Sequence, residues 1–238
     1  MASSKNGFKE TYILFGIDLD QAVAMGKMLH QANIAEGIEF KETIDGIKAI
    51  LKAREREQFD TLNRAFVGMY QKWIVSKGGK PLEEVFYECL LSRNLLVSTA
   101  ESITGGMIAS RIINVPGASR IIRKAFVLYD AKAKSEALSI PMSLIECYGE
   151  VSLEVVGEMA KNTQMLTKAN IVIATSGYAG PTSGSQSERL GEVCLGFAIG
   201  DDLTTIKKTF RGSRNQIRKQ AVAFALAFVI HYLNQKAQ

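Results

Sequence analysis

Residues 95–106 read LLVSTAESITGG, and the expected fold follows from this stretch. Its first half, residues 95–100, is a short and nearly continuous apolar run, which is typical of a buried strand. Small polar residues and two glycines come next, and the apolar spacing of Met107, Ile108 and Ile112 predicts a helix directly after them. A strand that turns sharply into a helix is the building unit of a layered α/β sheet.

The same alternation of helices and strands continues to the C-terminal end. Helices are expected over residues 81–93, 152–168 and from Ser213 onward, and further strands over residues 124–129, 170–175, 192–199 and 203–210. Because only Gly200-Asp201-Asp202 joins the last two strands, they are expected to form a hairpin. The sequence therefore predicts a layered, mostly parallel sheet with helices on both faces and an antiparallel edge hairpin.

The N-terminal part has a different pattern and is expected to form a small α/β lobe. A strand is expected over residues 12–17, a helix over 22–29 and one or two short strands between 34 and 53. An aromatic and apolar stripe at helical spacing then predicts a core-facing helix; it consists of Phe59, Leu62, Phe66, Met69, Tyr70 and Trp73. Lys77-Gly78-Gly79-Lys80 is typical of a linker, so we expect a lobe over residues 1–78 and a second domain over residues 79–238.

Composition excludes several classes of protein. The chain has 238 residues, of which 47% are hydrophobic and 22% charged, as in ordinary globular proteins and unlike disordered or collagen-like chains. The longest apolar run, residues 221–230, is about half of the ~20 residues that a membrane-spanning helix needs, so no membrane contact is expected. The first residues lack the apolar core of a signal peptide.

The cysteines and histidines predict neither a disulfide framework nor a metal site. Cys89, Cys147 and Cys194 are odd in number and far apart, which is typical of reduced thiols in a cytoplasmic protein. With no clustered metal ligands, neither a metal ion nor another cofactor is expected. The net charge of +5 comes mostly from residues 111–134 and 207–219, which form either two solvated surfaces or a shared anion site.

Three predicted turns are rich in glycine and small polar residues. They cover residues 100–106, 129–134 and 175–181. In open α/β sheets, ligands bind at the carboxyl ends of the strands, where glycines allow a close approach of the backbone and helix-start amides favour an anion. These turns are therefore the candidate site.

The turns also carry a resemblance to a known family. Five segments, in this order, resemble the signatures of the CinA C-terminal domain family: AESITGG, VPGAS from Val115, Tyr129 with Lys134 five residues on, SGYAGP from Ser176 and FRGSRNQIR from Phe210. The resemblance covers residues 81–234, and the family includes nicotinamide-nucleotide amidohydrolases. The N-terminal lobe more faintly resembles the KH-like middle segment of longer CinA proteins. The molybdopterin-binding-like domain that precedes that segment is expected to be missing here.

The resemblance implies a reaction and three catalytic residues. The reaction is deamidation of nicotinamide mononucleotide to nicotinate mononucleotide and ammonia. The family's nucleophile matches Ser102, and its partners match Tyr129 and Lys134. A small-molecule nucleotide is then the expected partner, and a homodimer the expected assembly.

The chemistry of the residues agrees with that assignment. Amide hydrolysis needs a nucleophile, a base and donors for the developing oxyanion. His30 and His231 do not follow predicted strands, so a Ser–His–Asp set is poorly supported. A lysine can replace histidine when it is held uncharged, which burial or nearby cations favour. We hypothesise that neutral Lys134 takes the proton of Ser102, directly or through the hydroxyl of Tyr129.

Further residues are candidates for binding the substrate. Amides of the turn that includes Thr104, Gly105 and Gly106 would hold the oxyanion. Ser176 and Gly177 offer a hydroxyl and an amide to phosphate or ribose. Arg214 and Arg218, one helical turn apart, would bind the 5′-phosphate.

Each of these residues also has a purely structural interpretation. Ser102 could be a helix N-cap, Tyr129 a packing aromatic, Lys134 a solvated lysine and the arginines an exposed helix face. After Tyr129, Asp130-Ala131 replace the usual Ser-Asn of relatives. Residues 182–190 replace a more glycine-rich loop, and we expect them to be mobile.

Two other functions compete with the amidohydrolase. One is a catalytically silent nucleotide-binding or regulatory protein that keeps the fold. The other is nucleic-acid binding through the N-terminal lobe, but residues 1–78 contain no GxxG loop and interleave basic with acidic residues. Nucleic acid is therefore not expected as a partner.

Overall fold

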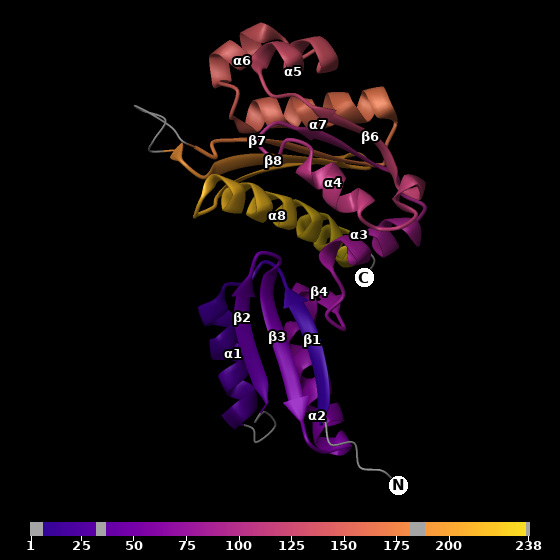
Figure 1. The fold of residues 1–238 in the computed structure, drawn as a ribbon, viewed down its shortest axis with the longest axis vertical. Coiled ribbons are helices and arrows are strands. Elements are labelled where there is room, and N and C mark those ends of the chain that lie inside the picture. The colour runs from indigo at the N-terminus through magenta and orange to yellow at the C-terminus, as the bar shows by residue number, and fades with distance from the viewer. Residues whose placement is uncertain (1–6, 32–36, 181–188, 237–238) are drawn as a thin grey trace. The chain divides into compact units, whose positions relative to one another are not determined.

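The computed structural model describes residues 7–31, 37–180 and 189–236 (Figure 1). The chain packs as two compact units, one formed by residues 1–85 with 227–238 and the other by residues 86–226. The expected boundary at residues 78 and 79 stays a prediction. Most of residues 182–190, whose mobility we expected, lie outside the described residues.

The N-terminal unit is built on a four-stranded antiparallel sheet. Its strands run in the order β2-β3-β1-β4 and are β1 (Phe8–Leu14), β2 (Ile38–Thr43), β3 (Gly46–Ala53) and β4 (Ile74–Lys77). Helices α1 (Leu19–Gln31) and α2 (Arg56–Tyr70) pack on this sheet, and a short 3-10 helix, η1 (Gln71–Trp73), follows α2. Two strands lie between residues 34 and 53, where one or two were expected, whereas β4 was not predicted.

The aromatic stripe of α2 fills the core of this unit, as the sequence predicts. The rings of Phe66 and Tyr70 stack with centroids 4.4 Å apart, and Tyr12 stacks on Phe66 at 5.1 Å. The hydroxyl of Tyr70 donates to the carbonyl oxygen of Ala22 over 2.6 Å, and burial raises the pKa of Tyr70 to about 12. The buried hydroxyl thus has its hydrogen-bond partner, as a buried polar group requires.

The C-terminal unit contains the predicted layered sheet. Its strands run in the order β6-β5-β7-β8-β9 and are β5 (Val97–Glu101), β6 (Ile122–Val127), β7 (Ile171–Gly177), β8 (Glu192–Ile199) and β9 (Asp202–Thr209). Strand β5 pairs in parallel with β6 and β7, and β8 pairs antiparallel with β7 and β9. Strand β8 is therefore the one strand of this sheet that runs against the others. The expected mostly parallel sheet with an antiparallel edge hairpin is confirmed.

Helices lie on both faces of this sheet (Figure 1). One face carries α5 (Ala131–Leu138), α6 (Met142–Tyr148) and α7 (Leu153–Thr167); the other carries α4 (Met107–Ile113) and the part of α8 (Arg214–Gln235) within this unit. The remaining helical elements are α3 (Leu82–Leu91) and η2 (Ala118–Arg120). Ser152 caps α7, as predicted, because its hydroxyl accepts a hydrogen bond from the amide of Val155 over 3.2 Å.

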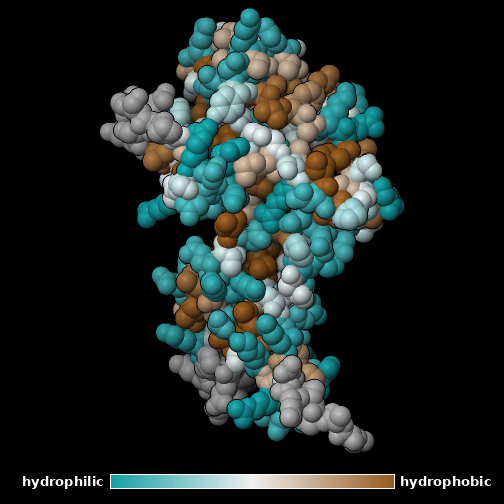
Figure 2. All heavy atoms as spheres, in the orientation of Figure 1, coloured by the Kyte–Doolittle hydropathy of each residue, from teal (hydrophilic) through white to brown (hydrophobic). Residues whose placement is uncertain are grey.

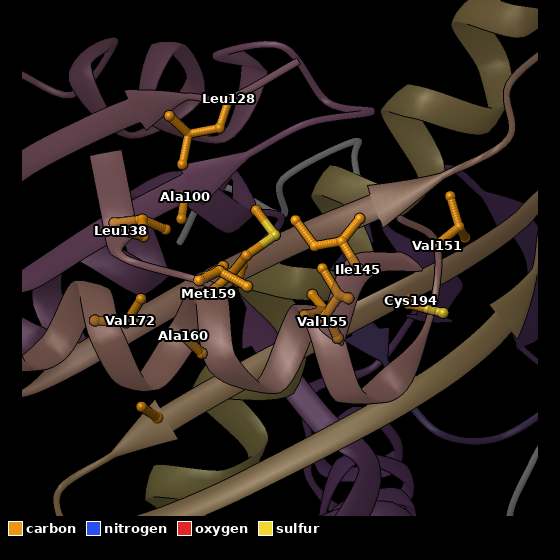
Figure 3. Close-up of a cluster of buried hydrophobic side chains, with 14 of the residues drawn as sticks. Ala100, Leu128, Leu138, Ile145, Val151, Val155, Met159, Ala160, Val172 and Cys194 are labelled. Atoms are coloured by element: carbon orange, nitrogen blue, oxygen red, sulfur yellow. The ribbon is translucent and has the colours of Figure 1, made fainter. Parts of the chain in front are cut away.

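A hydrophobic core fixes α7 against the sheet. Val155, Met159 and Ala160 of α7 are fully buried in one cluster with Ala100 of β5 and Val172 of β7 (Figure 3). Burying such side chains contributes about 1.5–3 kcal/mol for each larger aliphatic one. This cluster consequently fixes α7 against both β5 and β7.

The surface of the C-terminal unit carries both hydrophilic and hydrophobic side chains. Figure 2 shows hydrophilic and hydrophobic residues interspersed on the face of the C-terminal unit that it displays. Within residues 7–31, 37–180 and 189–236, no helix has the length and apolar character that crossing a membrane would take.

Candidate active site

Ser102 stands at the carboxyl end of β5, in a turn that is tied to the neighbouring strand β7. The amide of Ser102 donates to the carbonyl oxygen of Thr175 over 2.9 Å, and the amide of Gly105 donates to the carbonyl oxygen of Ser102 over 3.1 Å. The hydroxyls of Thr104 and Thr175 lie 2.8 Å apart and share a hydrogen bond. Ser102 is 8% exposed, so it lies in a nearly closed part of the turn. The side chain of Thr104 is fully buried and fixes the turn through Thr175.

Glu101, just before Ser102, serves the beginning of α4. Its fully buried carboxylate accepts hydrogen bonds from the amides of Ile108 and Ala109, both over 3.0 Å. Gly106 is the N-cap residue of α4. Because Glu101 already provides acceptors for these amides, the interpretation of Ser102 as the N-cap of this helix is wrong. The sequence analysis did not single out Glu101.

The two glycines of the turn are required by the backbone. Gly105 has φ +57° and Gly106 has φ +85°, a left-handed conformation that costs about 1–2 kcal/mol for other residues. A Cβ atom on Gly105 would also lie 3.0 Å from Nη2 of Arg218. Their presence is therefore explained by the shape of the turn before any ligand is considered.

Arg218 of α8 holds the turn through its backbone. Its Nε donates to the carbonyl oxygen of Ile103 over 2.9 Å, and its Nη2 donates to that of Thr104 over 3.0 Å. In a trans peptide the N–H and C=O point in opposite directions, so the amide of Thr104 points away from Arg218. Among the described residues, the amides of Ile103, Thr104 and Gly106 have no protein acceptor. These three amides are the donors that the turn offers to an oxyanion.

Lys134 lies in the first part of α5 and is buried. Its side chain is 1% exposed, and its Nζ lies 2.5 Å from Oε2 of Glu150, whose side chain is 44% exposed. Asp130 caps α5 by accepting from the amide of Ala133 over 2.7 Å. The interpretation of Lys134 as a solvated lysine is therefore wrong. Its ion-pair partner is a carboxylate, whereas burial or nearby cations are the conditions that favour an uncharged lysine.

Glu150 connects Lys134 to strand β7, and sequence reasoning missed it. The buried hydroxyl of Ser176 donates to the carbonyl oxygen of Glu150 over 2.7 Å. Next along β7, a Cβ atom on Gly177 would lie 2.8 Å from the carbonyl oxygen of Glu192 and 2.8 Å from Cδ1 of Ile103. The small size of Gly177 is thus explained by packing between β8 and the Ser102 turn.

Tyr129 and Arg214 meet at the same edge of the sheet. Nη2 of Arg214 donates to the hydroxyl of Tyr129 over 2.7 Å, and Nη1 donates to the carbonyl oxygen of Gly180. Tyr129 is 62% exposed, so it is not the packing aromatic of the structural interpretation. This contact joins the turns that follow β6 and β7 to the beginning of α8.

Arg189 braces the segment next to Glu150. Its Nη2 donates to the carbonyl oxygen of Val151 over 3.0 Å, and its guanidinium lies 4.7 Å from the ring centroid of Tyr178. The hydrogen bond with Glu192 raises the pKa of Arg189, so the Arg189 guanidinium stays positively charged in these contacts. The sequence analysis gave Arg189 no role.

The structure therefore brings the three predicted turns to one edge of the sheet. Ser102 contacts β7 through Thr175, Lys134 is linked to Ser176 through Glu150, and Tyr129 contacts Arg214. Of the two arginines, Arg218 is engaged with the turn itself. Across the described residues, His, Cys, Asp and Glu side chains form no group of three or more that could hold a metal ion.

Known proteins similar to this chain are named as CinA-like or as competence-damage inducible proteins. The family model described as the CinA C-terminal domain matches residues 79–233. A CinA-like protein of Petrotoga mobilis is 28% identical over 238 residues, which are 99% of this chain and 58% of that protein. A CinA-like protein of Fervidobacterium nodosum is 37% identical over 146 residues, covering 61% of this chain and 36% of that protein. The chain spans about half the length of the curated relatives it matches.

Solved structures of the same superfamily share the fold. A CinA superfamily protein from Escherichia coli is similar with a TM-score of 0.61 and 30% identity, over 63% of this chain and 88% of that one. A competence or damage-inducible protein from Enterobacter asburiae is similar with a TM-score of 0.61 and 30% identity, over 64% of this chain and 96% of that one.

Proposed function

This chain belongs to the CinA C-terminal domain family, and on that premise we propose that it hydrolyses the carboxamide of nicotinamide mononucleotide, giving nicotinate mononucleotide and ammonia. The names of its relatives identify the family and no reaction. The proposed reaction therefore rests on the resemblance of the motifs and on the residues of the candidate site.

One observation carries the proposal: a buried lysine and an amide-lined serine turn stand at the same edge of the sheet. Lys134 is 1% exposed, and its ion-pair partner Glu150 accepts a hydrogen bond from Ser176 at its carbonyl oxygen. The residue before Ser176, Thr175, accepts the hydrogen bond from the amide of Ser102. An amine that is shielded from water is suited to proton transfer within the site. The unpaired amides of the turn supply donors where an oxyanion develops.

The reaction then proceeds in two halves. Uncharged Lys134 takes the proton of Ser102, directly or through the Tyr129 hydroxyl, and Oγ bonds to the carboxamide carbon. The carbonyl oxygen becomes an oxyanion that the turn amides stabilise, and the C–N bond breaks as Lys134 gives its proton to the leaving nitrogen. Water then attacks the resulting ester; Lys134 accepts the water proton and returns it to Oγ of Ser102.

The nucleotide's phosphate is assigned to Arg214. Its guanidinium is exposed and has five N–H donors, so the contacts with Tyr129 and Gly180 leave donors for an anion. Arg218 has a weaker claim on the phosphate, because its Nε and Nη2 already bind the turn. Thr104, Gly106 and Gly177 contribute through backbone amides in this proposal. Gly105 contributes through the shape of the turn, because its amide is bonded to Ser102, and Ser176 contributes by holding Glu150.

A second candidate function is a catalytically silent nucleotide-binding protein. The observation that favours it is the ion pair of Lys134 with Glu150, because an ammonium group cannot accept a proton. Lys134 has to give up one proton before it can act as a base.

Ammonia release from nicotinamide mononucleotide separates the two functions. The amidohydrolase releases ammonia from the mononucleotide and less from nicotinamide or NAD, with and without a chelator. Ser102→Ala should lower kcat at least about 10³-fold, as loss of a nucleophile does in other hydrolases. Binding of the mononucleotide in calorimetry without ammonia release supports the silent protein. Light scattering on the same sample tests the expected homodimer, and fractionation of cells tests the expected cytoplasmic location.

A further inference from the structure

The pairing of Lys134 with Glu150 joins a group sealed from water to a group in contact with it. The side chain of Lys134 is 1% exposed and that of Glu150 is 44% exposed, and 2.5 Å separates Nζ from Oε2. A buried amine cannot exchange protons with bulk water directly. Every proton that Lys134 exchanges with bulk water therefore needs a neighbouring group that reaches solvent, and Glu150 is such a group.

The backbone that carries Glu150 is held at three successive carbonyl groups. The hydroxyl of Ser152 donates to the carbonyl oxygen of Gly149 over 2.9 Å, and the hydroxyl of Ser176 donates to that of Glu150 over 2.7 Å. Nη2 of Arg189 donates to the carbonyl oxygen of Val151 over 3.0 Å. Three side chains from three different parts of the chain thus fix one short loop segment. A surface ion pair needs no such support, whereas a proton-transfer group has to be positioned.

We propose that Glu150 is the proton conduit between Lys134 and solvent, and that this transfer is what prepares Lys134 to act as a base. The inference rests on the proposed hydrolysis for its role in turnover. The carboxylate of Glu150 accepts a proton from the Lys134 ammonium, which leaves a neutral amine and a neutral carboxylic acid. The acid then passes the proton to water and becomes a carboxylate again. No oxidant or co-reactant is needed, and the amine lone pair is free for the proton of Ser102.

A purely stabilising role for Glu150 predicts a different effect on activity when the carboxylate is removed. If the carboxylate only holds Lys134 as an ammonium group, its removal raises activity or leaves it unchanged. If it is the conduit, its removal traps the proton on Lys134 and lowers activity. The sign of the change distinguishes the two roles.

The first experiment observes the proton itself and needs no turnover. Lysine Nζ is labelled with ¹⁵N in the full chain, the Lys134 signal is assigned with Lys134→Arg, and exchange of its protons with water is measured by NMR. Glu150→Gln should slow this exchange about 10²-fold or more, because a positioned proton-transfer group contributes about 10²–10⁴-fold. Glu150→Asp, which keeps the carboxylate, should fall between the two. Unchanged or faster exchange in Glu150→Gln overturns the proposal.

A matched control removes a charge of the same sign nearby. Glu146 lies on α6, four residues before Glu150, and its side chain is exposed. Glu146→Gln should leave the exchange at Lys134 as it is in the unchanged protein. Slowing to the same extent in both variants would show that net charge, and not the conduit, controls the exchange, and would overturn the proposal.

The second experiment tests the role in turnover by chemical rescue. Glu150→Ala should lower the rate of ammonia release about 10²-fold, and added formate should restore part of it by replacing the missing carboxylate. Failure of formate to rescue a folded Glu150→Ala protein would contradict the role in turnover. If the unchanged protein releases no ammonia, the proposed function fails, and the exchange measurement still decides whether Glu150 is the conduit.

Discussion

Nε of Arg218 donates to the carbonyl oxygen of Ile103 over 2.9 Å, so a side chain of α8 holds the peptide group between Ile103 and Thr104, the two residues that follow Ser102. With the second bond to Thr104, Arg218 fixes the direction of the turn's amides. This contact gives Arg218 a positioning role that the sequence analysis did not foresee, because there it was a phosphate ligand.

Arg218→Ala should lower kcat for nicotinamide mononucleotide and change KM little. Loss of the two bonds frees the turn, and a misplacement of about 1 Å at a catalytic group costs on the order of 10²-fold. Arg218→Lys should restore little, because an ammonium group cannot reproduce the fork of a guanidinium. Lys219→Ala, at an exposed neighbour, is the control. A raised KM with an unchanged kcat would instead support the predicted phosphate contact.

Arg214→Ala should discriminate between the mononucleotide and its nucleoside. A charge-assisted contact is worth about 1.5–3 kcal/mol, so kcat/KM for the mononucleotide should fall roughly 10- to 100-fold. For nicotinamide riboside, which lacks the phosphate, kcat/KM should stay nearly constant. The control is Arg211→Ala, which removes the same charge from an exposed position nearby. Equal losses on both substrates would show that Arg214 does not bind the phosphate.

Gly105→Ala should destabilise the protein by about 1–2 kcal/mol, because φ at this position is +57° and a methyl group would crowd Arg218. Gly68→Ala is the matched control, because the same substitution is expected there to change stability in the opposite direction. Gly68 lies within α2 and has nothing within 4 Å of an added Cβ, so its replacement should stabilise by about 1 kcal/mol. Urea unfolding followed by circular dichroism measures both, and a stabilising Gly105→Ala would contradict the role assigned to the turn.

Two pairs of lysines face each other across strands of the N-terminal sheet. Lys9 is opposite Lys52 in the pairing of β1 with β3, and Lys41 is opposite Lys48 in the pairing of β2 with β3. Like charges directly opposite each other destabilise a sheet by about 0.2–1 kcal/mol. Lys41→Glu should therefore raise the free energy of unfolding by a similar amount. Adding Lys48→Glu restores a like-charged pair and should abolish the gain.

The three thiols should differ in reactivity toward iodoacetamide. Burial raises the pKa of Cys194 to about 11 and also raises the pKa of Cys89, whereas Cys147 is exposed. Since the thiolate is the reactive form, only about one part in 10³ of Cys194 is reactive at pH 8. Mass spectrometry of the folded protein at that pH should find Cys147 alkylated first. Early labelling of Cys194 would show that β8 opens.

The strands of the C-terminal sheet were predictable because their apolar runs are long and end in turn residues. Residues 95–100 and 170–175 match β5 and β7 within two residues at each end. Strand β4 escaped prediction, since Ile74–Lys77 is short and directly follows a helical stripe that continues to Trp73. Local pattern cannot separate such a strand from the end of a helix.

The order of the strands was sufficient to predict which turns form the site. Ser102 and Tyr129 follow β5 and β6, and Ser176 lies at the carboxyl end of β7. Because β6 and β7 both pair in parallel with β5, the approach of these residues to one edge follows from the order of the strands. Glu150 carried no such signal, because its ion pair spans 16 positions and depends on how α5 and the loop before α7 pack. The role of Arg218 was equally hidden, since its acceptors are main-chain carbonyls, which every residue has.

The carboxylate of Glu101 has a consequence for how a nucleotide can be oriented. It provides the protein's own counter-charge for the positive end of the α4 dipole, so the amides of Ile108 and Ala109 are not available to the phosphate of a ligand. A mononucleotide that brings the uncharged carboxamide of its pyridinium ring to Ser102 must direct its anionic phosphate elsewhere, toward the guanidinium of Arg214 at the beginning of α8. The orientation of the ligand in the site would then be set by Glu101, a residue that does not contact the ligand.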